Sequence, residues 1–360
     1  MDPINVNDYE VLAKACMEPA AWDYYQGGSD DEITLRANRN AYEHIRLRPR
    51  VLVDVSSCDL STSFLGTQVG MPIMIAPTSA HQLAHTEGEL ATARAAGASN
   101  TLMIVSTLST YSLEEIAKVA SGPLWFQLYI YHDLDTTVRL VRRAELAGYR
   151  ALVLTVDTPR LGKRERDLRN GFSLPKHIRL ANFTHDAWKG TLGGERASIT
   201  WKSLEWLKSL TSLPILLKGI LTAEDALLAI EHGVAGIVVS NHGGRQLDSV
   251  PASIEVLSEI TEAVAGQCEV YVDGGVRRGT DILKALGLGA QAVLIGRPPL
   301  WGLAAQGEEG VSHVLNILRE ELELAMILAG RPTIASIDRS IVRMVLPLPP
   351  GPHQLLLYDV

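Results

Sequence analysis

The sequence contains little cysteine, no excess of basic residues and no long apolar run. Its three cysteines, Cys16, Cys58 and Cys268, are widely separated and form no CxxC pair. This sparse pattern argues against structural disulfides or a zinc site and favours a reducing compartment. The formal net charge of -8 gives no reason to expect a nucleic acid or an anionic membrane as a partner.

The sequence also shows no residue pattern typical of a sorting signal or a membrane span. The uninterrupted apolar runs fall short of the ~18 residues that indicate a membrane-spanning helix. Residues 1–8 lack the basic and apolar regions of a signal peptide, and residues 358–360 are not a peroxisomal address. We therefore expect a soluble, cytoplasmic protein without a metal site.

What the sequence does contain is a repeated unit that begins at Pro72. Each unit has a short apolar run, a loop with polar residues or glycine, and a helix-like segment, such as 87–98, 136–147, 223–232 and 279–287. Near-continuous apolar strands that alternate with helices are typical of a parallel sheet covered by helices. The apolar runs are 73–76, 102–105, 124–128, 151–154, 215–217, 236–239, 270–272 and 292–295. Eight such runs predict a closed (β/α)8 TIM barrel. A doubly wound sheet is the alternative, although no early GxGxxG loop supports it.

The 360 residues, with an apolar share of 46% and a charged share of 21%, suit a single large domain, 1–360. We divide it into an N-terminal extension of helices and strands over 1–71, the barrel over 72–330 and a C-terminal tail over 331–360. Residues 6–39 are expected to be helical, with a break at 27–30 where Ser29 or Asp30 would be the N-cap of the next helix. One or two short strands are expected between 45 and 64, over the barrel floor.

The chemistry of such a barrel lies at the carboxyl ends of its strands. Polar or ionisable residues follow the predicted strands, whereas the strand interiors stay apolar. Because these ends meet at one rim, we expect the side chains to converge on one site. In chain order they are Pro77, Thr78, Ser79, Ser106, Gln127, Tyr129, Thr155, Asp157, Lys218, Ser240, His242, Arg245, Asp273, Gly274, Gly275, Arg277, Gly296 and Arg297.

The ends of the last two strands predict a phosphate site. Loops at these positions commonly bind phosphate through backbone N–H groups and a helix N-terminus. Gly274, Gly275 and Gly296 would leave N–H groups accessible, and Arg277 and Arg297 would neutralise the charge. Ordinary turns with surface arginines are the alternative.

A flat, polar ring would find hydrogen-bonding groups on the neighbouring strand ends, at Ser106, Gln127, Thr155 and Lys218. Lys218 allows two interpretations. It could form a Schiff base, as in aldolases, or it could stay cationic and stabilise negative charge on a reduced cofactor ring.

The most informative stretch follows the apolar run at 236–239. It reads Ser240-Asn241-His242-Gly243-Gly244-Arg245-Gln246-Leu247-Asp248. A histidine can move a proton near neutral pH, and an arginine offers a planar fork that binds a carboxylate. Glycines at this point allow a backbone or a flat ligand to come close. A polar loop in which the histidine serves only as a hydrogen-bonding group is the alternative.

Further groups would complete a site for a small acid. Arg164, from the loop after the fourth strand, could join Arg245 at the rim and bind a carboxylate bidentately. Asp157 is placed to orient the His242 imidazole and to stabilise its protonated form. Two hydroxyl groups could close over the substrate, those of Tyr24 and Tyr129.

The stretch 240–248 resembles the signature of the FMN-dependent α-hydroxy-acid oxidases and dehydrogenases, a family that acts on glycolate, lactate and mandelate. The resemblance covers nearly the whole chain, and it is strongest to a soluble mandelate or 4-hydroxymandelate oxidase. Its other parts are Asp23-Tyr24-Tyr25, Pro77-Thr78, Gln127-Leu128-Tyr129, Leu154-Thr155-Val156-Asp157-Thr158-Pro159, Leu217-Lys218-Gly219 and Asp273-Gly274-Gly275-Val276-Arg277.

The resemblance implies an FMN cofactor at the barrel rim, with its phosphate at Arg277, Gly296 and Arg297. Lys218 would lie beside the N1–C2=O edge of the flavin. Further cofactor contacts would come from Pro77, Thr78, Ser79, Ser106, Gln127, Thr155, Ser240, Asp273, Gly274 and Gly275.

The same resemblance implies the roles of the remaining groups. His242 would be the catalytic base, paired with Asp157, and Tyr129 would bind the substrate hydroxyl. The substrate carboxylate would be bound by Arg164, Arg245 and Tyr24. The resemblance also implies a homotetramer of barrels.

The substrate is suggested by Leu108, which stands where the glycolate-oxidising members of the family carry Trp. A smaller apolar side chain would open room beside the substituent on the substrate α-carbon. We therefore expect an aromatic (S)-2-hydroxy acid, either mandelate or 4-hydroxymandelate. A small or aliphatic acid, such as glycolate or lactate, is the alternative. Residues 171–198 are a further expected part of the pocket lining.

No haem domain precedes the barrel and no long apolar insert follows the fourth strand. We therefore expect dioxygen as the electron acceptor, with hydrogen peroxide and a 2-oxo acid as products. Two other functions stay open, a Schiff-base lyase that acts on phosphorylated substrates and a catalytically silent binding protein on the same scaffold.

Overall fold

Eight parallel strands form a closed barrel in the computed structural model, which describes residues 2–183 and 199–345. Neighbouring strands follow chain order, and β11 pairs with β4 to close the barrel. The strands are β4 Ile73–Ile75, β5 Leu102–Val105, β6 Leu124–Leu128, β7 Leu152–Thr155, β8 Ile215–Ile220, β9 Gly236–Val239, β10 Glu269–Asp273 and β11 Ala292–Ile295. Each predicted apolar run overlaps one of these strands, and the predicted (β/α)8 barrel is confirmed.

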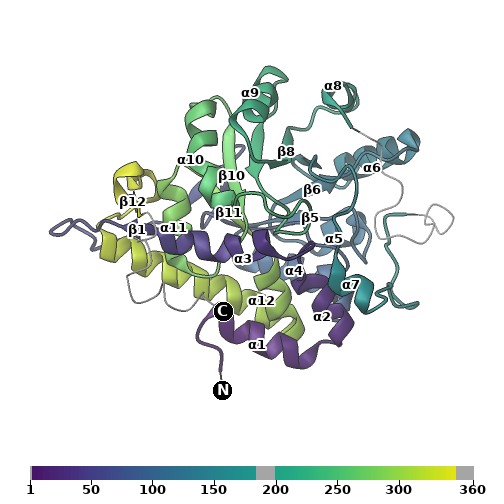
Figure 1. The fold of residues 1–360 in the computed structure, drawn as a ribbon, viewed down its shortest axis with the longest axis horizontal. Helices are drawn as coiled ribbons and strands as arrows, with labels where there is room; N and C mark the ends of the chain where they lie inside the picture. The colour runs from purple at the N-terminus through teal and green to yellow at the C-terminus, as the bar shows by residue number, and fades with distance from the viewer. Residues whose placement is uncertain (1, 184–198, 346–360) are drawn as a thin grey trace, which may run out of the picture.

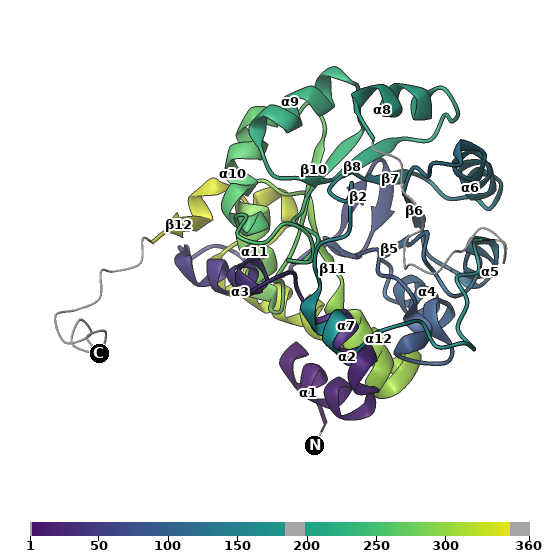
Figure 2. The ribbon, with the colours of Figure 1, turned by 45° about the vertical axis from the view of Figure 1, so that its right-hand side comes forward.

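Helices surround these strands, as Figure 1 and Figure 2 show. They are α4 Gly88–Ala98, α5 Leu113–Val119, α6 Leu134–Leu146, α8 Trp201–Lys208, α9 Ala223–Glu231, α10 Ser253–Val264, α11 Gly279–Gly287 and α12 Arg297–Ala329. Two short helices, η2 His81–Leu83 and α7 Glu165–Arg169, lie in the loops after β4 and β7. The four segments predicted as helices coincide closely with α4, α6, α9 and α11.

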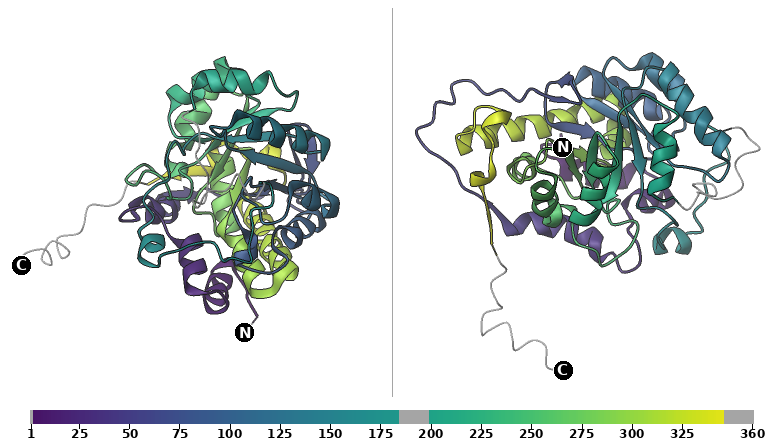
Figure 3. Two further views of the ribbon diagram at one scale, coloured as in Figure 1. Left: turned by 90° about the vertical axis from the view of Figure 1, so that its right-hand side faces the viewer. Right: turned by 90° about the horizontal axis from the view of Figure 1, so that it is seen from above.

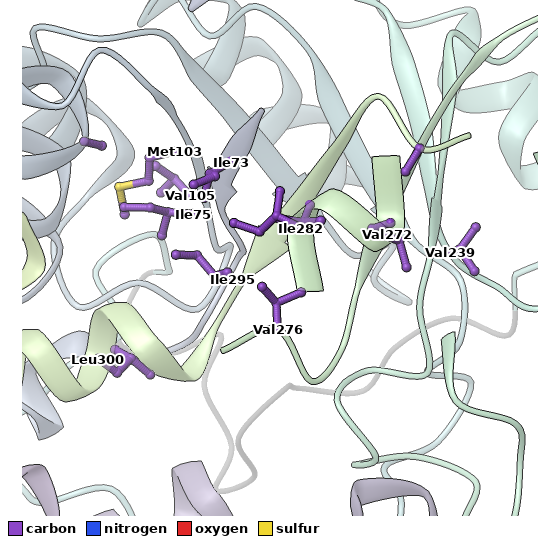
Figure 4. Packing of buried hydrophobic residues seen from close by; sticks show 14 of the residues in the cluster. Ile73, Ile75, Met103, Val105, Val239, Val272, Val276, Ile282, Ile295 and Leu300 are labelled. Carbon is purple, nitrogen blue, oxygen red and sulfur yellow. The ribbon is translucent and has the colours of Figure 1, made fainter. Parts of the chain in front are cut away.

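The period-two alternation of side chains along each strand builds two apolar cores. Met74, Ile104, Trp125, Leu216 and Tyr271 belong to a cluster of strand residues that fills the barrel interior. The alternate strand residues point outward and pack against the helices. Figure 4 shows part of this outer core, with Ile73, Ile75, Met103, Val105, Val239, Val272 and Ile295 of the strands beside Val276, Ile282 and Leu300.

A hairpin of β2 Thr62–Phe64 and β3 Thr67–Val69 closes the N-terminal end of the barrel. Phe64 and Val69 join the interior cluster, and the backbone N–H of Leu65 donates to both carboxylate oxygens of Glu269 at 3.1 Å. Of the one or two short strands expected between 45 and 64, β2 lies in this hairpin, and its partner β3 lies beyond the predicted range. A third strand, β1 Ile45–Leu47, pairs instead with β12 Val342–Met344 from the predicted C-terminal tail.

The N-terminal extension holds three helices, α1 Val6–Cys16, α2 Pro19–Gln26 and α3 Ile33–Asn40, followed by η1 Ala41–His44. In Figure 3 the purple N-terminal helices lie beside the yellow-green α12. The contact between α1 and α12 includes a hydrogen bond from the Tyr9 hydroxyl to Gln306 Oε1 at 2.8 Å. Gln306 and Gly307 have non-helical backbone angles, so α12 bends there.

The predicted cap of α3 was wrong. The N-cap is Glu32, in a left-handed conformation with φ 58°, and neither Ser29 nor Asp30 caps the helix. The carboxylate of Asp248 accepts instead from the N–H groups of Ile33 at 3.1 Å and Thr34 at 2.8 Å. A side chain more than two hundred positions away therefore satisfies the first turn, which no local pattern indicates.

Of the helices in the described ranges, none has the length and apolar character of a membrane span. Cys16, Cys58 and Cys268 are free thiols, as the sequence predicts. Short helices η4 Ile334–Ser336 and η5 Arg339–Ile341 precede β12. Residues 358–360, and residues 184–198 of the predicted pocket lining, lie outside the described residues.

Candidate active site

A single pocket at the C-terminal rim gathers the predicted site residues. Its empty space is about 1070 Å³, open solvent at the mouth included. Every predicted site residue lines it except Asp157 and Ser240, which contact residues that do. The predicted residues in the lining are Tyr24, Pro77, Thr78, Ser79, Ser106, Leu108, Gln127, Tyr129, Thr155, Arg164, Lys218, His242, Arg245, Asp273, Gly274, Gly275, Arg277, Gly296 and Arg297.

The strand pleat explains why these polar groups converge. Trp125, Leu216 and Tyr271 point into the barrel, so residues two positions further along the strands point inward as well. These residues are Gln127, Lys218 and Asp273. The barrel interior therefore changes from apolar to polar at its C-terminal end, where the pocket opens.

Lys218 lies in a buried, hydrogen-bonded ion pair. Its Nζ atom is 3.0 Å from Asp273 Oδ2 and donates to Ser240 Oγ at 2.8 Å. Burial opposes the charge, but Asp273 and Asp157 outweigh it and raise the pKa of Lys218. A lysine that forms a Schiff base must be neutral when it attacks, so this environment argues against the lyase interpretation.

Gln127 is held by the neighbouring strand ends. Its Nε2 atom donates to Thr155 Oγ1 at 3.0 Å, and its Oε1 atom accepts from the backbone N–H of Thr107 at 3.2 Å and from Ser106 Oγ at 3.4 Å. All four residues are buried. The side-chain amide is thereby fixed at the pocket wall in one orientation, as a ring-binding group requires.

His242 is paired with Asp157. The Nδ1 atom of the imidazole is 2.9 Å from Asp157 Oδ1 and 3.2 Å from Oδ2, so a proton on Nδ1 is shared with the carboxylate. This leaves Nε2 as the nitrogen that can accept a proton. Burial lowers the pKa of His242, and Lys218 adds to the effect while Asp157 opposes it. The imidazole is therefore neutral near pH 7, as a general base must be.

The loop that carries His242 is strained and tightly held. His242 has φ 59°, and its backbone N–H donates to Ser240 Oγ at 3.0 Å. The side chain of Asn241 pairs with that of Asn38 through two bonds of 2.8 Å. A β-carbon on Gly244 would lie 2.6 Å from the backbone N of Leu35, so only glycine allows α3 to approach here. Sequence reasoning missed Asn38, which no motif marks.

Four arginines line the pocket, Arg164, Arg245, Arg277 and Arg297. Burial lowers the pKa of Arg277 to about 10, and burial with repulsion from Arg164 lowers the pKa of Arg245 to about 10. Burial, followed by repulsion from Arg245 and Arg277, lowers the pKa of Arg297 well below its usual range. Such mutual repulsion is relieved by bound anions, so the cluster is suited to a phosphate and a carboxylate.

The C-terminal end of α2 holds two of these arginines. Arg245 donates to Gly27 O at 2.7 Å, and Arg297 donates to Tyr25 O at 2.9 Å and to Gly27 O at 3.2 Å. Carbonyls at a helix C-terminus carry partial negative charge and favour nearby cations. Helix α2 therefore positions arginines predicted for two different anions, a link that the sequence did not reveal.

The predicted phosphate end is built from the β10 and β11 loops. Gly274 and Gly275 have φ 100° and 81°, and a β-carbon on Gly275 would lie 1.8 Å from Asn38 O. Helix α12 begins at Arg297, but Pro298 and Pro299 follow, so its first turn has fewer N–H donors than expected. Loop amides and the two arginine side chains are therefore the groups available to a phosphate at this end of the pocket.

Tyr24 lines the pocket at its predicted substrate end. Its hydroxyl is hydrogen-bonded to Ser79 Oγ, its ring is stacked on Phe172 with centroids 4.6 Å apart, and the Arg245 guanidinium lies 5.2 Å from its centroid. Tyr129 and Leu108 line the same pocket and are buried. Phe172 belongs to the stretch 171–198 that was expected to line the pocket, but none of the described residues 171–183 lines it.

The chemistry of the pocket fits FMN. Arginines and glycines at one end suit a phosphate, and the fixed amide, hydroxyl and ammonium groups suit a polar ring. Among the described residues that line the pocket, two have a buried side-chain atom without a hydrogen-bond partner, Nε of Arg164 and Oδ1 of Asp273. Both atoms belong to pocket residues and are available to a bound ligand.

Fold and site together define a barrel enzyme that binds a phosphorylated cofactor and a small anion. A family model described as FMN-dependent dehydrogenase matches residues 13–344. The chain belongs to this family, and its cofactor is FMN. The predicted family, enzyme class and cofactor are thereby confirmed.

Individual relatives support the assignment. L-lactate oxidase from Nostoc sp. is 54% identical over 359 residues, covering 95% of this chain and 98% of the relative. Glycolate oxidase from Spinacia oleracea is 50% identical over 352 residues, covering 94% and 95%. A crystal structure of mandelate oxidase with benzoyl-formic acid matches with a TM-score of 0.91 and 45% sequence identity. The match covers 96% of this chain and 100% of that chain.

Proposed function

We propose that this protein oxidises an (S)-2-hydroxy acid to the 2-oxo acid and reduces dioxygen to hydrogen peroxide. The relatives named above are oxidases of lactate, glycolate and mandelate. The observation that carries the proposal is the joint presence of the His242–Asp157 pair and two arginines, Arg164 and Arg245, around one pocket.

His242 acts as the base. The acid loses two electrons and two protons when it becomes a 2-oxo acid, and Nε2 of the neutral imidazole accepts one of these protons. The proton comes from the hydroxyl if a hydride leaves, or from the α-carbon if a carbanion forms, and both routes need a neutral His242. Asp157 then stabilises the imidazolium. When bound, FMN accepts the two electrons.

Arg164 and Arg245 bind the substrate carboxylate, with the Tyr24 hydroxyl as a third group. Two guanidinium groups fix the orientation of a carboxylate as well as its charge. Tyr129 binds the substrate hydroxyl. Lys218 stays cationic in its pair with Asp273 and stabilises negative charge on the reduced cofactor.

Two substrate classes are supported by different observations. Leu108, 5% exposed in the pocket lining, and the structural similarity to mandelate oxidase favour an aromatic acid such as mandelate or 4-hydroxymandelate. The 54% identity to an L-lactate oxidase favours lactate. We propose the aromatic acid as the preferred substrate and lactate as the second candidate.

Anaerobic bleaching of the flavin tests both the function and the substrate. The purified protein is mixed with glycolate, lactate, both enantiomers of mandelate and 4-hydroxymandelate, and the loss of flavin absorbance is followed. Fastest bleaching by (S)-mandelates supports the first candidate, and fastest bleaching by lactate supports the second. A flavin that none of these acids bleaches would contradict the proposed oxidase and leave a silent binding protein.

We also propose a homotetramer of barrels, on the strength of the family resemblance, and the cytoplasmic location stays a prediction. The division into 1–71, 72–330 and 331–360 stays a prediction, and the pairing of β1 with β12 joins its two outer parts. Light scattering on the holoprotein measures the molecular mass directly, and a monomer would contradict the tetramer.

A further inference from the structure

A buried histidine lies behind the wall of the cofactor pocket. His81 of η2 is 1% exposed and does not line the pocket, but Thr78 does. The His81 Nε2 atom is 2.6 Å from Thr78 Oγ1, and its Nδ1 atom is 3.0 Å from Thr92 Oγ1. The Thr92 hydroxyl lies 3.2 Å from Gly88 O within α4. A row of hydrogen bonds therefore connects the pocket wall to this helix.

One arrangement of protons gives each side-chain donor in the row an acceptor within the row. The Thr92 hydroxyl donates to Gly88 O, the Nδ1–H of His81 donates to Thr92 Oγ1, and the Thr78 hydroxyl donates to His81 Nε2. In the reverse arrangement Nε2–H donates to Thr78, whose own proton then points out of the row, toward the pocket. The first arrangement keeps every side-chain donor of the row paired within the protein, and the proposal below is built on it.

The order of donors and acceptors along this row requires a neutral His81 imidazole. Burial lowers the pKa of His81 below its ordinary value, although Glu89 and a hydrogen bond with the Thr78 backbone oppose this shift. The Glu89 carboxylate does not need the ring as a partner, because it accepts from the backbone N–H groups of His81 and Thr110, each at 3.0 Å. A neutral ring carries one N–H and one acceptor nitrogen.

We propose that His81 is a positioning residue that makes the Thr78 hydroxyl a hydrogen-bond acceptor toward bound FMN. With its proton committed to His81, Thr78 offers only lone pairs to the pocket. FMN carries donors that could use them, namely its ribityl hydroxyls and the N–H of its ring. The inference rests on FMN as the cofactor and does not depend on which acid is oxidised.

The binding test compares four forms of the apoprotein, the wild type, Thr78→Val, His81→Phe and the double variant. FMN dissociation constants are measured by quenching of flavin fluorescence. Loss of one hydrogen bond should weaken FMN binding roughly tenfold in each single variant. Because His81 acts through Thr78, the double variant should bind no more weakly than Thr78→Val alone. Multiplicative effects of the two substitutions would contradict the proposal.

Thr92→Val provides a milder test that leaves both the ring and the pocket intact. It removes the acceptor of Nδ1–H, frees the ring to change tautomer, and should weaken FMN binding severalfold. Thr137→Val is the matched control, because the Thr137 hydroxyl is also buried but accepts from the N–H of Tyr131 at 3.0 Å, outside this row. Equal FMN affinity in the two threonine variants would contradict the proposal.

Nitrogen-15 NMR of the holoprotein observes the tautomer itself. The His81 signals are assigned by their absence from the spectrum of His81→Phe. If His81→Phe does not fold, they are assigned by the chemical-shift changes that Thr92→Val causes. We expect a protonated Nδ1 and an unprotonated Nε2, and a protonated Nε2 would overturn the inference. Neither the FMN-binding measurements nor the NMR measurement uses a 2-hydroxy acid. A failure of the bleaching test would therefore not change the conclusion drawn from them.

Discussion

His242 takes its chemical character from the residues around it. Its ring is buried, a carboxylate holds one nitrogen, and a cationic lysine and arginine act on its charge from the pocket. We expect His242→Ala to keep FMN, because the predicted phosphate and ring contacts are unchanged, but to slow flavin reduction by about 10²–10⁴-fold or more. Anaerobic stopped-flow absorbance measures this rate, and near-normal reduction would remove His242 from its proposed role.

The pH dependence of the reaction follows from the same environment. Burial lowers the pKa of His242 from its ordinary 6.5, and a base works only when it is unprotonated. The acidic limb of kcat/KM should therefore lie below pH 6.5, with activity lost as the pH falls through the lowered pKa. Asp157→Asn removes the carboxylate that opposes the shift, so its limb should lie at still lower pH. A limb above pH 6.5 in the wild type would contradict this assignment.

Leu108 tests what controls the choice of acid. A tryptophan there would fill space that an aromatic substituent on the substrate needs, at an estimated cost of about 1–3 kcal/mol in the transition state. Leu108→Trp should therefore lower kcat/KM for mandelate roughly 10–200-fold relative to glycolate. Steady-state kinetics on the two acids measures this ratio. An unchanged ratio would show that other residues set the pocket size.

At the scale of elements, a side chain from a distant loop stabilises the start of a helix. The first turn of α3 depends on Asp248, which follows the His242 loop by only a few residues. Asp248→Ala should lower the free energy of unfolding by about 1–2 kcal/mol, as expected for the loss of a helix cap. Urea denaturation measures the change. Asp31→Ala is the control, because the Asp31 side chain does not cap α3, and an equal loss there would contradict the assignment.

At the scale of the whole molecule, the barrel brings four arginines to one rim, where they repel each other. A phosphate relieves this repulsion, so FMN should raise the unfolding temperature more than riboflavin at the same concentration. Free FMN at one hundred times its dissociation constant should add about 2.7 kcal/mol of stability. Differential scanning calorimetry of the apoprotein with each ligand measures the shifts, and equal shifts would argue against a phosphate site at Arg277 and Arg297.

The strands were predictable because each is a short, buried apolar run, and eight of them in alternation with helices leave few alternatives to a closed barrel. The rim residues followed from that topology, since the carboxyl ends of parallel strands meet. The cap of α3 was not predictable, because its partner comes from a distant loop rather than from the local pattern. The role of Asn38, held against Asn241, left no signal for the same reason.

The sequence by itself determined the family, the cofactor and the residue types of the pocket, because local hydrophobic pattern and short motifs carry that information. Only the tertiary structure decided the charge states and contacts. Lys218 is cationic beside Asp273, and His242 is neutral, because both are buried beside groups from remote segments. The hydrogen bond from Arg245 to the carbonyl at the end of α2 also depends on the distance between remote segments. Those quantities exist only once the barrel has closed.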